Sequence, residues 1–550
     1  MTDLSLLVEA AAYICAIWSF FVFIVQSIGI SRIFASCSYR PRPPVTPSLP
    51  KDQVPHVTII RPVKGLEPEL YHCLASTFHL DYPLDKLTVY LCVSEKTDPA
   101  YPVLLKLAQD YRQFDVRVFV EHDDPLLHGS AGHVDNLGPN PKIRNVSRAY
   151  REAKGDIIWM IDCNIWVGKG TAGRMVDKLL GLRHDGKQGQ PYKFVHMLPL
   201  VVDTVSLWGS PSPQSENETL LSSSSPTSEG GLPTYLSRND NTLLARIRNH
   251  GGGRLDEMFM ATTHAKFYSA INTVGIAPCI VGKSNMFRKS HLDTLTDPAQ
   301  NPSLPAHKTP HPTGIDYFSN YICEDHLIGD LLFRSKLPGL KNHGLVFGDL
   351  AVQPTAGMSV ASYIGRRVRW LRARKWTVIT ATLVEPGVES LLCCAYCAFA
   401  LTTIPWFHER WGVPQTWAAM GWIWLATVAL WVMGDWFTYR RLHAGHSTEV
   451  DERTPGFARG TSNRGGAPGR SFFLEWIPAW VGREVLALPI WTWAVLLGAT
   501  VNWRGNKFLV RMDMSVVEYD KPRTQKLSAV RSGVPSPNGG VRSRSNNRQD

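Results

Sequence analysis

The 550-residue sequence contains only ten cysteines, and those outside the apolar segments show no paired spacing. It also lacks a basic leading segment followed by a small-residue cleavage site, which argues against a cleaved signal peptide. The scattered cysteines favour a reducing, cytosolic location for the soluble part of the chain. The pair Cys394-x-x-Cys397 lies inside an apolar run without a second ligand pair. We interpret these two thiols as small, membrane-buried side chains rather than a metal or redox motif.

The net charge of +11 is not accompanied by an aromatic–basic recognition motif, so we expect no nucleic-acid partner. Much of the excess positive charge lies beside apolar segments and in the C-terminal tail, which is typical of anchoring next to acidic membrane lipids. Hydrophobic residues make up 44% of the chain, yet its mean hydropathy is −0.11. This combination predicts a soluble domain flanked by membrane spans.

Composition divides the chain into an ordered series of predicted segments. These are a membrane anchor at 1–30, a Pro-rich linker at 31–55, a catalytic domain at 56–358 with a largely disordered insertion at about 203–254, a basic interfacial helix at 359–376, a C-terminal membrane region of two to three spans at 377–503, and a basic, disordered tail at 504–550. Arg32, Arg40 and Arg42 follow the anchor and place the catalytic domain in the cytosol. Counting spans puts the C-terminus outside the cytosol, whereas the basic tail predicts the reverse.

The catalytic segment alternates apolar strands with helices. We expect helices at 67–78 and 100–111, and strands at Val57–Ile60, Leu87–Val93, Val116–Val120, Ile157–Ile161 and Phe194–Leu200. Continuous apolar strands in this order predict an α/β fold with a mostly parallel sheet covered on both faces. Ligands of such sheets bind beyond the carboxyl ends of the strands, where Asp98 and Asp162 are expected.

Carboxylates and arginines form the candidate site. Asp98, Asp162 and Asp325 are the acidic candidates, while Arg366 and Arg369 would share one helix face and could hold a diphosphate. Each feature alone has an ordinary explanation: a turn or helix cap for an aspartate, an interfacial helix for the basic run, a core position for His196 and a membrane anchor for Trp370. Their order along one chain favours a sugar-nucleotide transferase. Gly282-Lys283-Ser284 is not a phosphate loop, because the leading glycine is absent.

Several short motifs resemble the ceramide glucosyltransferase family (glycosyltransferase family 21), a membrane-bound family of inverting enzymes with a GT-A type cytosolic domain. The inserts make this sequence similar to fungal members. The motifs are Pro62-Val63-Lys64-Gly65, Leu91-Cys92-Val93, Asp98-Pro99-Ala100, Asn140-Pro141-Lys142-Ile143, Trp159-Met160-Ile161-Asp162, Val195-His196-Met197-Leu198-Pro199, Glu324-Asp325, Arg366-x-x-Arg369-Trp370 and Glu385-Pro386.

The resemblance implies transfer of glucose from UDP-glucose to the primary hydroxyl of ceramide, with inversion, at a Golgi or ER membrane. This reaction begins glucosphingolipid synthesis. By resemblance Asp325 is the base, Asp162 lies at the diphosphate and a divalent metal (Mn²⁺ or Mg²⁺), and donor binding falls to Asp98, Lys142, His196, Arg366, Arg369 and Trp370. Two departures stand out: Glu95 is a second acid before Asp98, and Asp162-Cys163-Asn164 lacks the second acid of an Asp-x-Asp metal motif. Glu324 has no predicted role.

Two alternatives remain open at this point. A processive polysaccharide synthase shares the aspartates, but it usually begins the basic cluster with Gln where Arg366 stands, and it needs more spans for a polymer channel. A non-enzymatic membrane scaffold would use the basic helix only to hold lipids. The sequence pattern alone does not choose between glucose and another hexose, and it leaves the oligomeric state unknown.

Overall fold

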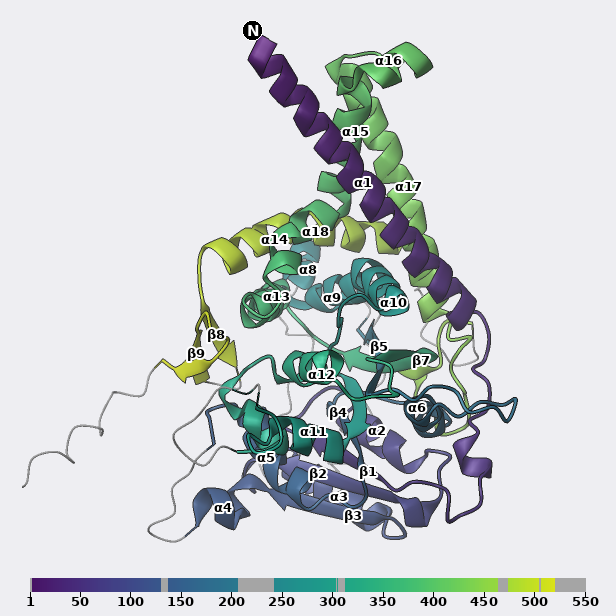
Figure 1. The fold of residues 1–550 in the computed structure, drawn as a ribbon, viewed down its shortest axis with the longest axis vertical. Helices are drawn as coiled ribbons and strands as arrows, with labels where there is room; N and C mark the ends of the chain where they lie inside the picture. Colours follow the sequence, from purple (N-terminus) through teal and green to yellow (C-terminus); the bar gives the residue numbers. More distant parts are fainter. Residues whose placement is uncertain are drawn as a thin grey trace, which may run out of the picture.

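A mixed, mostly parallel sheet forms the centre of the predicted catalytic domain (Figure 1). The computed structural model describes residues 2–129, 137–205, 242–302, 304, 312–462, 473–503 and 506–519. Within these residues the sheet has seven strands in the order β3-β2-β1-β4-β6-β5-β7. The strands are β1 Val57–Pro62, β2 Leu87–Val93, β3 Asp115–Val120, β4 Ile157–Ile161, β5 Phe194–Asp203, β6 Ser284–Arg288 and β7 Gly344–Thr355.

Strand β6 is the antiparallel member, paired with both β4 and β5, while β1–β2, β2–β3, β1–β4 and β5–β7 are parallel pairs. Because β6 runs against both its neighbours, β4 and β5 point the same way. The carboxyl ends of β1, β2, β4, β5 and β7 therefore lie at one edge of the sheet. The predicted GT-A type α/β fold is confirmed.

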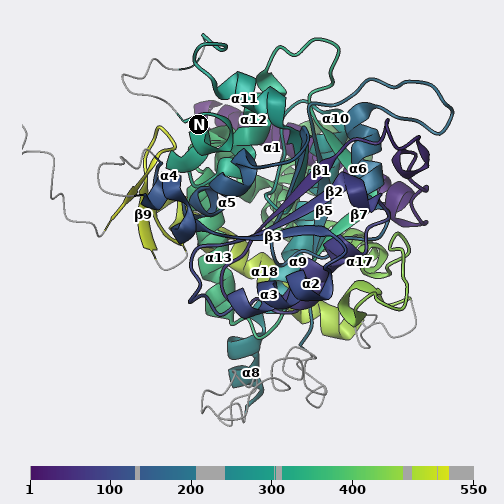
Figure 2. The same cartoon turned by 90° about the horizontal axis from the view of Figure 1, so that it is seen from below.

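Helices cover both faces of the sheet (Figure 2). Every residue of β1, β2, β4 and β5 is buried, so the apolar runs need partners on each side. Alternate side chains such as Ile59 and Ile60 join different core clusters: one contains residues of α2, α3 and α6, the other residues of α5, α11 and α12. The helices of the domain are α2 Leu70–Ala75, α3 Tyr101–Asp110, α4 Pro125–His128, α5 Pro141–Arg151, α6 Thr171–Leu180, α8 Leu243–His250, α9 Gly252–Phe259, α10 Ala265–Val274, α11 Lys289–Thr296, α12 Glu324–Arg334 and α13 Val360–Arg374.

A bundle of long apolar helices rises from the domain (Figure 1). It contains α1 Thr2–Cys37, α15 Ser390–Thr403 and α17 Trp417–His443, with α14 Ile379–Val384 below it and α16 Pro405–Trp411 at its far end. Among the described residues, Leu6–Cys37 and Trp417–His443 are long and apolar enough to cross a membrane. The pair Ile379–Val388 and Ser390–Thr403, bent by 71°, makes a third span if it crosses as one unit.

Buried polar contacts fasten this bundle to the catalytic domain. Lys266 of α10 forms an ion pair with Asp435 of α17, and the indole Nε1 of Trp480 donates to the same carboxylate at 2.8 Å. A Cβ on Gly29 would lie 2.1 Å from the Lys266 carbonyl oxygen, so α1 and α10 approach closely only because residue 29 is glycine. Removing one partner of such a buried pair would leave an uncompensated charge, so the loss of either Lys266 or Asp435 is expected to destabilise this junction.

The C-terminal part of the described chain lies on the same side as the catalytic domain. Helix α18 Phe473–Trp491 runs across the base of the bundle rather than along it, and is not among the candidate spans (Figure 1). After α17, Glu449 contacts Arg174 of α6 at 3.0 Å. The position of α18 and the Glu449–Arg174 contact favour a C-terminus on the same side of the membrane as the catalytic domain, which is the side that the basic tail predicts. Residues 520–550 lie outside the described residues.

Two predictions of disorder need correction where the chain is described. Residues 243–254 of the expected insertion belong to α8 and α9, and the glycines there allow close packing, since a Cβ on Gly252 would lie 2.1 Å from the Ser359 carbonyl oxygen. The beginning of the expected tail forms the strands β9 Asn506–Val510 and β10 Val516–Glu518 of a second, antiparallel sheet. Its third strand, β8 Thr500–Trp503, is the end of the segment predicted as the C-terminal membrane region. The remainder of the insertion, 206–241, lies outside the described residues.

Candidate active site

Three of the predicted site residues meet around one ammonium group. The Nζ atom of Lys142 lies 3.0 Å from Oδ2 of Asp325 and 3.3 Å from Oδ1 of Asp162. The same nitrogen lies 3.2 Å from Oε1 of Glu324, and Lys283 Nζ lies 3.0 Å from Oδ2 of Asp162. We call Lys142, Asp162, Lys283, Glu324 and Asp325 the Lys142 cluster. It contains three carboxylates and two ammonium groups, so its formal charge is negative.

The first turn of α5 positions Lys142. Asn140 is the N-cap, its Oδ1 accepting from the backbone N–H of Lys142 at 2.8 Å and of Ile143 at 3.1 Å, and Pro141 fits the first helical position. A cation is unfavourable at a helix N-terminus. Burial would also lower the pKa of Lys142, but Asp162, Asp325 and Glu324 raise it well above its ordinary value. The three carboxylates therefore keep this buried lysine charged.

Asp162 stands where β4 ends, on a loop that several groups hold in place. Its backbone N–H donates to the Lys283 carbonyl at 3.1 Å, and the buried guanidinium of Arg61 donates to the carbonyls of Cys163 at 3.2 Å and Ile165 at 2.8 Å. Burial alone would raise the pKa of Asp162, but Lys142 and Lys283 outweigh it and lower the pKa to about 2. Asp162 is therefore a fixed negative charge at the sheet edge.

Glu324 and Asp325 begin α12, where the helix dipole favours acidic side chains. The side chain of Glu324 is 3% exposed and accepts from Asn140 Nδ2 at 3.1 Å, whereas that of Asp325 is 21% exposed. Burial, and then the charge of Asp325, raise the pKa of Glu324 to about 7 against the opposing effect of Lys142. Asp325 is thus the member of the pair that an acceptor can reach, while Glu324 supports Lys142 and Asn140 from behind.

Gly282 allows Asp325 to occupy this place. A Cβ on Gly282 would lie 1.7 Å from Oδ2 of Asp325, which no side-chain adjustment at Gly282 could relieve. The segment Gly282-Lys283-Ser284 contributes both this close approach and the Lys283 ammonium. Sequence reasoning missed Lys283 because β6 pairs antiparallel with β4, placing Ser284 opposite Ile161. No local pattern predicts that long-range register.

Asp98 lies at the same sheet edge, after β2, but its carboxylate contacts backbone groups. Its Oδ1 accepts from the N–H of Ala100 at 2.9 Å and of Gly65 at 3.0 Å, and its Oδ2 accepts from Gly65 at 3.1 Å. Asp98 thus ties the loop after β1 to the start of α3. Glu95, the second acid before it, is exposed.

His196 is a core histidine in this structure, and its imidazole contacts Tyr268 and His343 rather than the Lys142 cluster. The imidazole is fully buried on β5, its Nδ1 is hydrogen-bonded to the hydroxyl of Tyr268, and it stacks with His343 at a centroid distance of 5.6 Å. Burial, followed by the neighbouring His343 and Lys178, lowers the pKa of His196 well below its ordinary value. A neutral, enclosed imidazole supports the site from within the sheet.

The basic motif on α13 lies beyond the carboxyl ends of β5 and β7. The guanidinium of Arg366 lies over the ring of Trp370 at 4.8 Å, and its Nη2 donates to Oε1 of Gln353 at 3.3 Å. Trp370 packs against a cluster containing Val201 of β5 and Phe259. Arg369 follows Arg366 by three residues on this helix. The motif therefore lies at the same edge of the sheet as Asp162.

The described residues fit a divalent metal only if the nucleotide supplies most of its ligands. They contain no group of three or more His, Cys, Asp or Glu side chains placed to hold a metal ion. Asp162 has an ammonium partner at each carboxylate oxygen. Mg²⁺ is commonly bound through one or two carboxylates plus substrate phosphates, so Asp162 can serve as such a single protein ligand.

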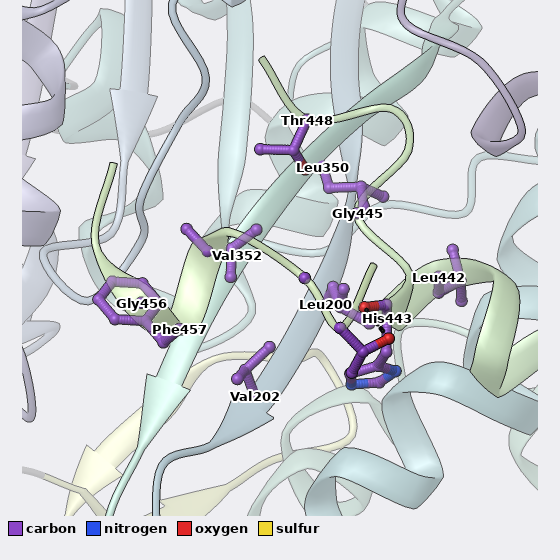
Figure 3. A pocket seen from close by; sticks show the side chains of 13 residues that line it. Leu200, Val202, Leu350, Val352, Leu442, His443, Gly445, Thr448, Gly456 and Phe457 are labelled. Carbon is purple, nitrogen blue, oxygen red and sulfur yellow. Dashed lines mark hydrogen bonds between the residues drawn. The ribbon is translucent and has the colours of Figure 1, made fainter. Parts of the chain in front are cut away.

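A hollow lined by β5, β7 and the 442–461 segment lies elsewhere (Figure 3). Its lining is mainly apolar, including Leu200, Val202, Leu350 and Val352, and His443 is the one titratable side chain in it. A diphosphate would find no cation there. The chemistry of the described chain is concentrated at the Lys142 cluster instead.

A mixed sheet of this order, with carboxylates and ammonium groups at its carboxyl edge and a membrane bundle beside it, defines a membrane-anchored GT-A type glycosyltransferase. The chain belongs to glycosyl transferase family 21, whose family model matches residues 19–208 and 306–516.

Curated relatives agree with this assignment. The ceramide glucosyltransferase of Pyricularia oryzae is 58% identical over 98% of this chain and 100% of its own length. That of Gibberella zeae is 51% identical over 92% of this chain and 93% of its own. That of Candida albicans is 32% identical over 84% and 88%. The predicted family resemblance is confirmed.

Solved structures are more distant. A mannosyltransferase of Pyrobaculum calidifontis in complex with GDP-Man and Mn²⁺ aligns over 77% of this chain and 98% of its own, at 13% identity and a TM-score of 0.35. A glucosyl-3-phosphoglycerate synthase of Mycobacterium tuberculosis in complex with Mg²⁺ and UDP aligns over 68% and 87%, at 13% identity and a TM-score of 0.26.

Proposed function

We propose that this protein transfers glucose from UDP-glucose to the primary hydroxyl of ceramide, with inversion, to give β-glucosylceramide. The observation that carries the proposal is the Lys142 cluster. In it the partly exposed carboxylate of Asp325 lies beside the ammonium group of Lys142, which also contacts Asp162, the carboxylate proposed to lie at the donor diphosphate. The family assignment and the relatives named ceramide glucosyltransferase supply the donor and acceptor.

Asp325 is the proposed base. An inverting transfer needs a group that takes the hydroxyl proton while the oxygen attacks the anomeric carbon from the face opposite the leaving UDP. The Asp325 side chain is 21% exposed, and it fits its position because residue 282 is glycine. The ammonium group of Lys142 lies beside it and can turn from this carboxylate toward the donor as the acceptor enters. The proton moves to Asp325, the new C–O bond forms, and the bond to the diphosphate breaks.

Cationic side chains stabilise the leaving diphosphate. Lys142 and Lys283 are the ammonium groups of the cluster, and Arg366 and Arg369 reach the same sheet edge from α13. Trp370 fixes the plane of Arg366 by stacking. We infer that Asp98 holds the loop at Gly65 in the conformation that binds the uridine part of the donor. His196 is inferred to support donor binding indirectly, through its packing on β5. A divalent metal on Asp162, when bound, would neutralise further charge on the diphosphate.

The catalytic domain is inferred to face the cytosol of a Golgi or ER membrane. Arg32, Arg40 and Arg42 follow the first span on the domain side, and Arg440 and Arg441 stand at the domain end of α17. All ten cysteines are free thiols, as a reducing compartment requires. UDP-sugars and a membrane-embedded acceptor can then meet at the base of the bundle.

Radiolabelled UDP-glucose supplied to ceramide-containing membranes tests the function. A chloroform-soluble monoglycosylated lipid supports the proposal. An insoluble polymer would support a polysaccharide synthase, for which up to three candidate spans in the described residues are few. Absence of any product and of UDP release would leave a membrane scaffold.

A further inference from the structure

Helix α18 turns its charged side chains toward the protein and an apolar face outward. Arg483 and Glu484, in the middle of the helix, are 1% and 4% exposed, and Arg483 pairs with Glu389 at 2.7 Å. The outward side carries four exposed apolar side chains: Leu474, Val481, Val485 and Leu488. A helix on the surface of a soluble protein has the opposite arrangement, with its polar side in the water. The outer face of α18 therefore fits an apolar environment.

The exposed residues of α18 form one continuous stripe. Positions 474, 481, 485 and 488 lie within about 60° of one another around the axis of an α-helix. The buried residues Trp476, Trp480 and Arg483 lie on the opposite side of the helix. Soluble monomers seldom expose large contiguous apolar patches, and such patches mark interaction sites. The stripe therefore indicates a surface that is covered by a partner.

Both ends of α18 are held on the side of the bundle where the catalytic domain lies. At its start, Phe473 packs against Trp436 of α17 with ring centroids 5.4 Å apart, one turn before Arg440. Just beyond its end, the ammonium of Lys375 on α13 donates to the Val495 carbonyl at 2.5 Å. The 19 residues of α18 extend about 28 Å, which is nearly enough to cross a bilayer. Because both ends lie beside basic residues of the same side, the contacts favour a helix that lies along the membrane.

Two more helices present apolar side chains near this level. On α14, Ile379 and Leu383 are exposed, and a 71° bend separates the segment Ile379–Val388 from α15, which rises into the bundle. On α8, Leu244 and Ile247 are exposed. Figure 1 shows α14 beside α18 and α8 just below them, and in Figure 2 α8 projects from the side of the domain. Since α8, α14 and α18 each pack against α13, three separate segments expose apolar side chains around that helix.

The lipid bilayer is the partner that this surface fits. The candidate spans expose apolar side chains as well, among them Phe20 of α1 and Leu430 and Phe437 of α17. Through the contact of Trp436 with Phe473, the apolar surface of α17 continues onto α18. Amphipathic helices that lie in a membrane surface bury their apolar face about 5–10 Å into the boundary between headgroups and acyl chains. The basic residues beside both ends of α18 suit the phosphates of that boundary.

We propose that α18, α14 and α8 lie in the plane of the membrane, with their exposed apolar faces inserted between the lipids of the leaflet next to the catalytic domain. Helix α18 then does not cross the bilayer. Lipids of this leaflet lie at the height of α13, the helix that carries Arg366 and Trp370. The proposal concerns the membrane contact alone and holds whichever sugar and lipid the protein uses.

Depth-dependent fluorescence quenching tests the orientation of α18. A fluorescent amino acid replaces Leu474, Val481 or Leu488, one at a time, in the full-length protein reconstituted into phosphatidylcholine vesicles. The vesicles contain a lipid with a spin label either close to its headgroup or close to the end of its acyl chain. We expect all three positions to lose more fluorescence to the shallow label than to the deep one. A helix that crosses the bilayer would place Val481 deep and the two flanking positions nearer opposite surfaces, and stronger quenching of Val481 by the deep label would overturn the proposal.

Two further positions calibrate the measurement. Leu430, in the middle of α17, is 63% exposed and should lose most fluorescence to the deep label. Leu105 on α3 is 47% exposed, lies far from the bundle and should respond to neither label. If the three α18 positions behave like Leu105, lipid does not cover this face and the proposal is wrong. Energy transfer between labelled copies in that case would identify a second copy of the chain as the partner.

Helix α8 is tested by the same label in place of Leu244. Quenching by the shallow label supports its position on the membrane, and a response like that of Leu105 would overturn the proposal for α8. None of these readouts requires turnover. A protein that forms no glycolipid but shows the expected quenching therefore contradicts the proposed function and leaves the membrane surface intact.

Discussion

The Lys142 cluster is one ion-pair network of the molecule, and a second, the arginine–glutamate cluster, is formed by Arg367, Arg374, Glu385, Glu389, Arg483 and Glu484. The two differ in composition and access. The first has two ammonium groups among three carboxylates, and Asp162 and Asp325 are 25% and 21% exposed. The second is balanced, uses guanidinium groups, and encloses Arg483, whose side chain is 1% exposed. Flexible lysines with accessible acids suit charge movement during a reaction, whereas planar arginines in closed pairs suit fixed positioning. The comparison assigns chemistry to the first network and fixed structural support of the membrane-proximal helices to the second.

The largest expected effect is on turnover at the first cluster. Asp325→Asn keeps the shape of the side chain but removes the proposed base, so kcat should fall ~10²–10⁴-fold. The affinity for UDP-glucose, measured by calorimetry, should remain close to that of the wild type. Turnover similar to the wild type would remove Asp325 from the mechanism.

The second cluster should respond in stability. Arg483→Met leaves Glu389 and Glu484 buried without their partner, which typically costs about 3–5 kcal/mol. The thermal denaturation midpoint in detergent should drop by several degrees. Arg410→Met removes an exposed arginine of α16 and serves as control, with a midpoint near that of the wild type. An Arg483→Met protein with the denaturation midpoint of the wild type would show that the second cluster does not stabilise the fold.

Donor binding should be sensitive to Lys283. Losing a charge-assisted contact to the diphosphate should reduce kcat/KM for UDP-glucose about 10–100-fold in Lys283→Ala. Lys187→Ala is the matched control, because Lys187 is exposed in the segment before β5, at the amino edge of the sheet. Unchanged kcat/KM in the Lys283 variant would limit that lysine to holding Asp162.

Glu324 should act on the pH dependence of stability rather than on turnover or donor binding. Its pKa is raised from 4.5 to about 7, so the folded state binds this proton more tightly and its contribution to stability falls as the pH rises from 4.5 through 7. A shift of this size corresponds to about 3 kcal/mol. His343, whose pKa is lowered to about 4 mainly by burial, acts in the opposite direction. The difference between the wild type and Glu324→Gln therefore isolates Glu324. Parallel curves for the two proteins would contradict the assignment.

Local patterns in the sequence predict much of the fold and part of the site. The apolar runs Leu87–Val93 and Ile157–Ile161 match β2 and β4 in full, because buried parallel strands are continuous in sequence. The predicted strand also places Asp162 directly after β4, as in the structure, while its role in ligand binding stays a prediction. Lys283 and Glu324 were missed because their roles depend on the register of β6 and on the packing of α12 against Asn140.

The membrane-proximal half was harder to predict from sequence. Glycine and serine content favoured disorder around 243–254, whereas Gly252 and Gly253 allow α9 to pack closely against Ser359 and Asp203. Arg483 and Glu484 are charged residues inside an apolar run. Arg483 is stabilised there by an ion pair with Glu389, which is 94 residues away in the sequence. Long-range ion pairs of this kind leave no local pattern.

The stereochemistry of the product tests the central claim most directly. UDP-glucose has an α-linked glucose, and direct attack by a ceramide hydroxyl activated by Asp325 must invert that centre. The account predicts a single β-linked glucosylceramide, identified from the coupling of the anomeric proton in the NMR spectrum of the product. An α-linked product would contradict single displacement with Asp325 as its base.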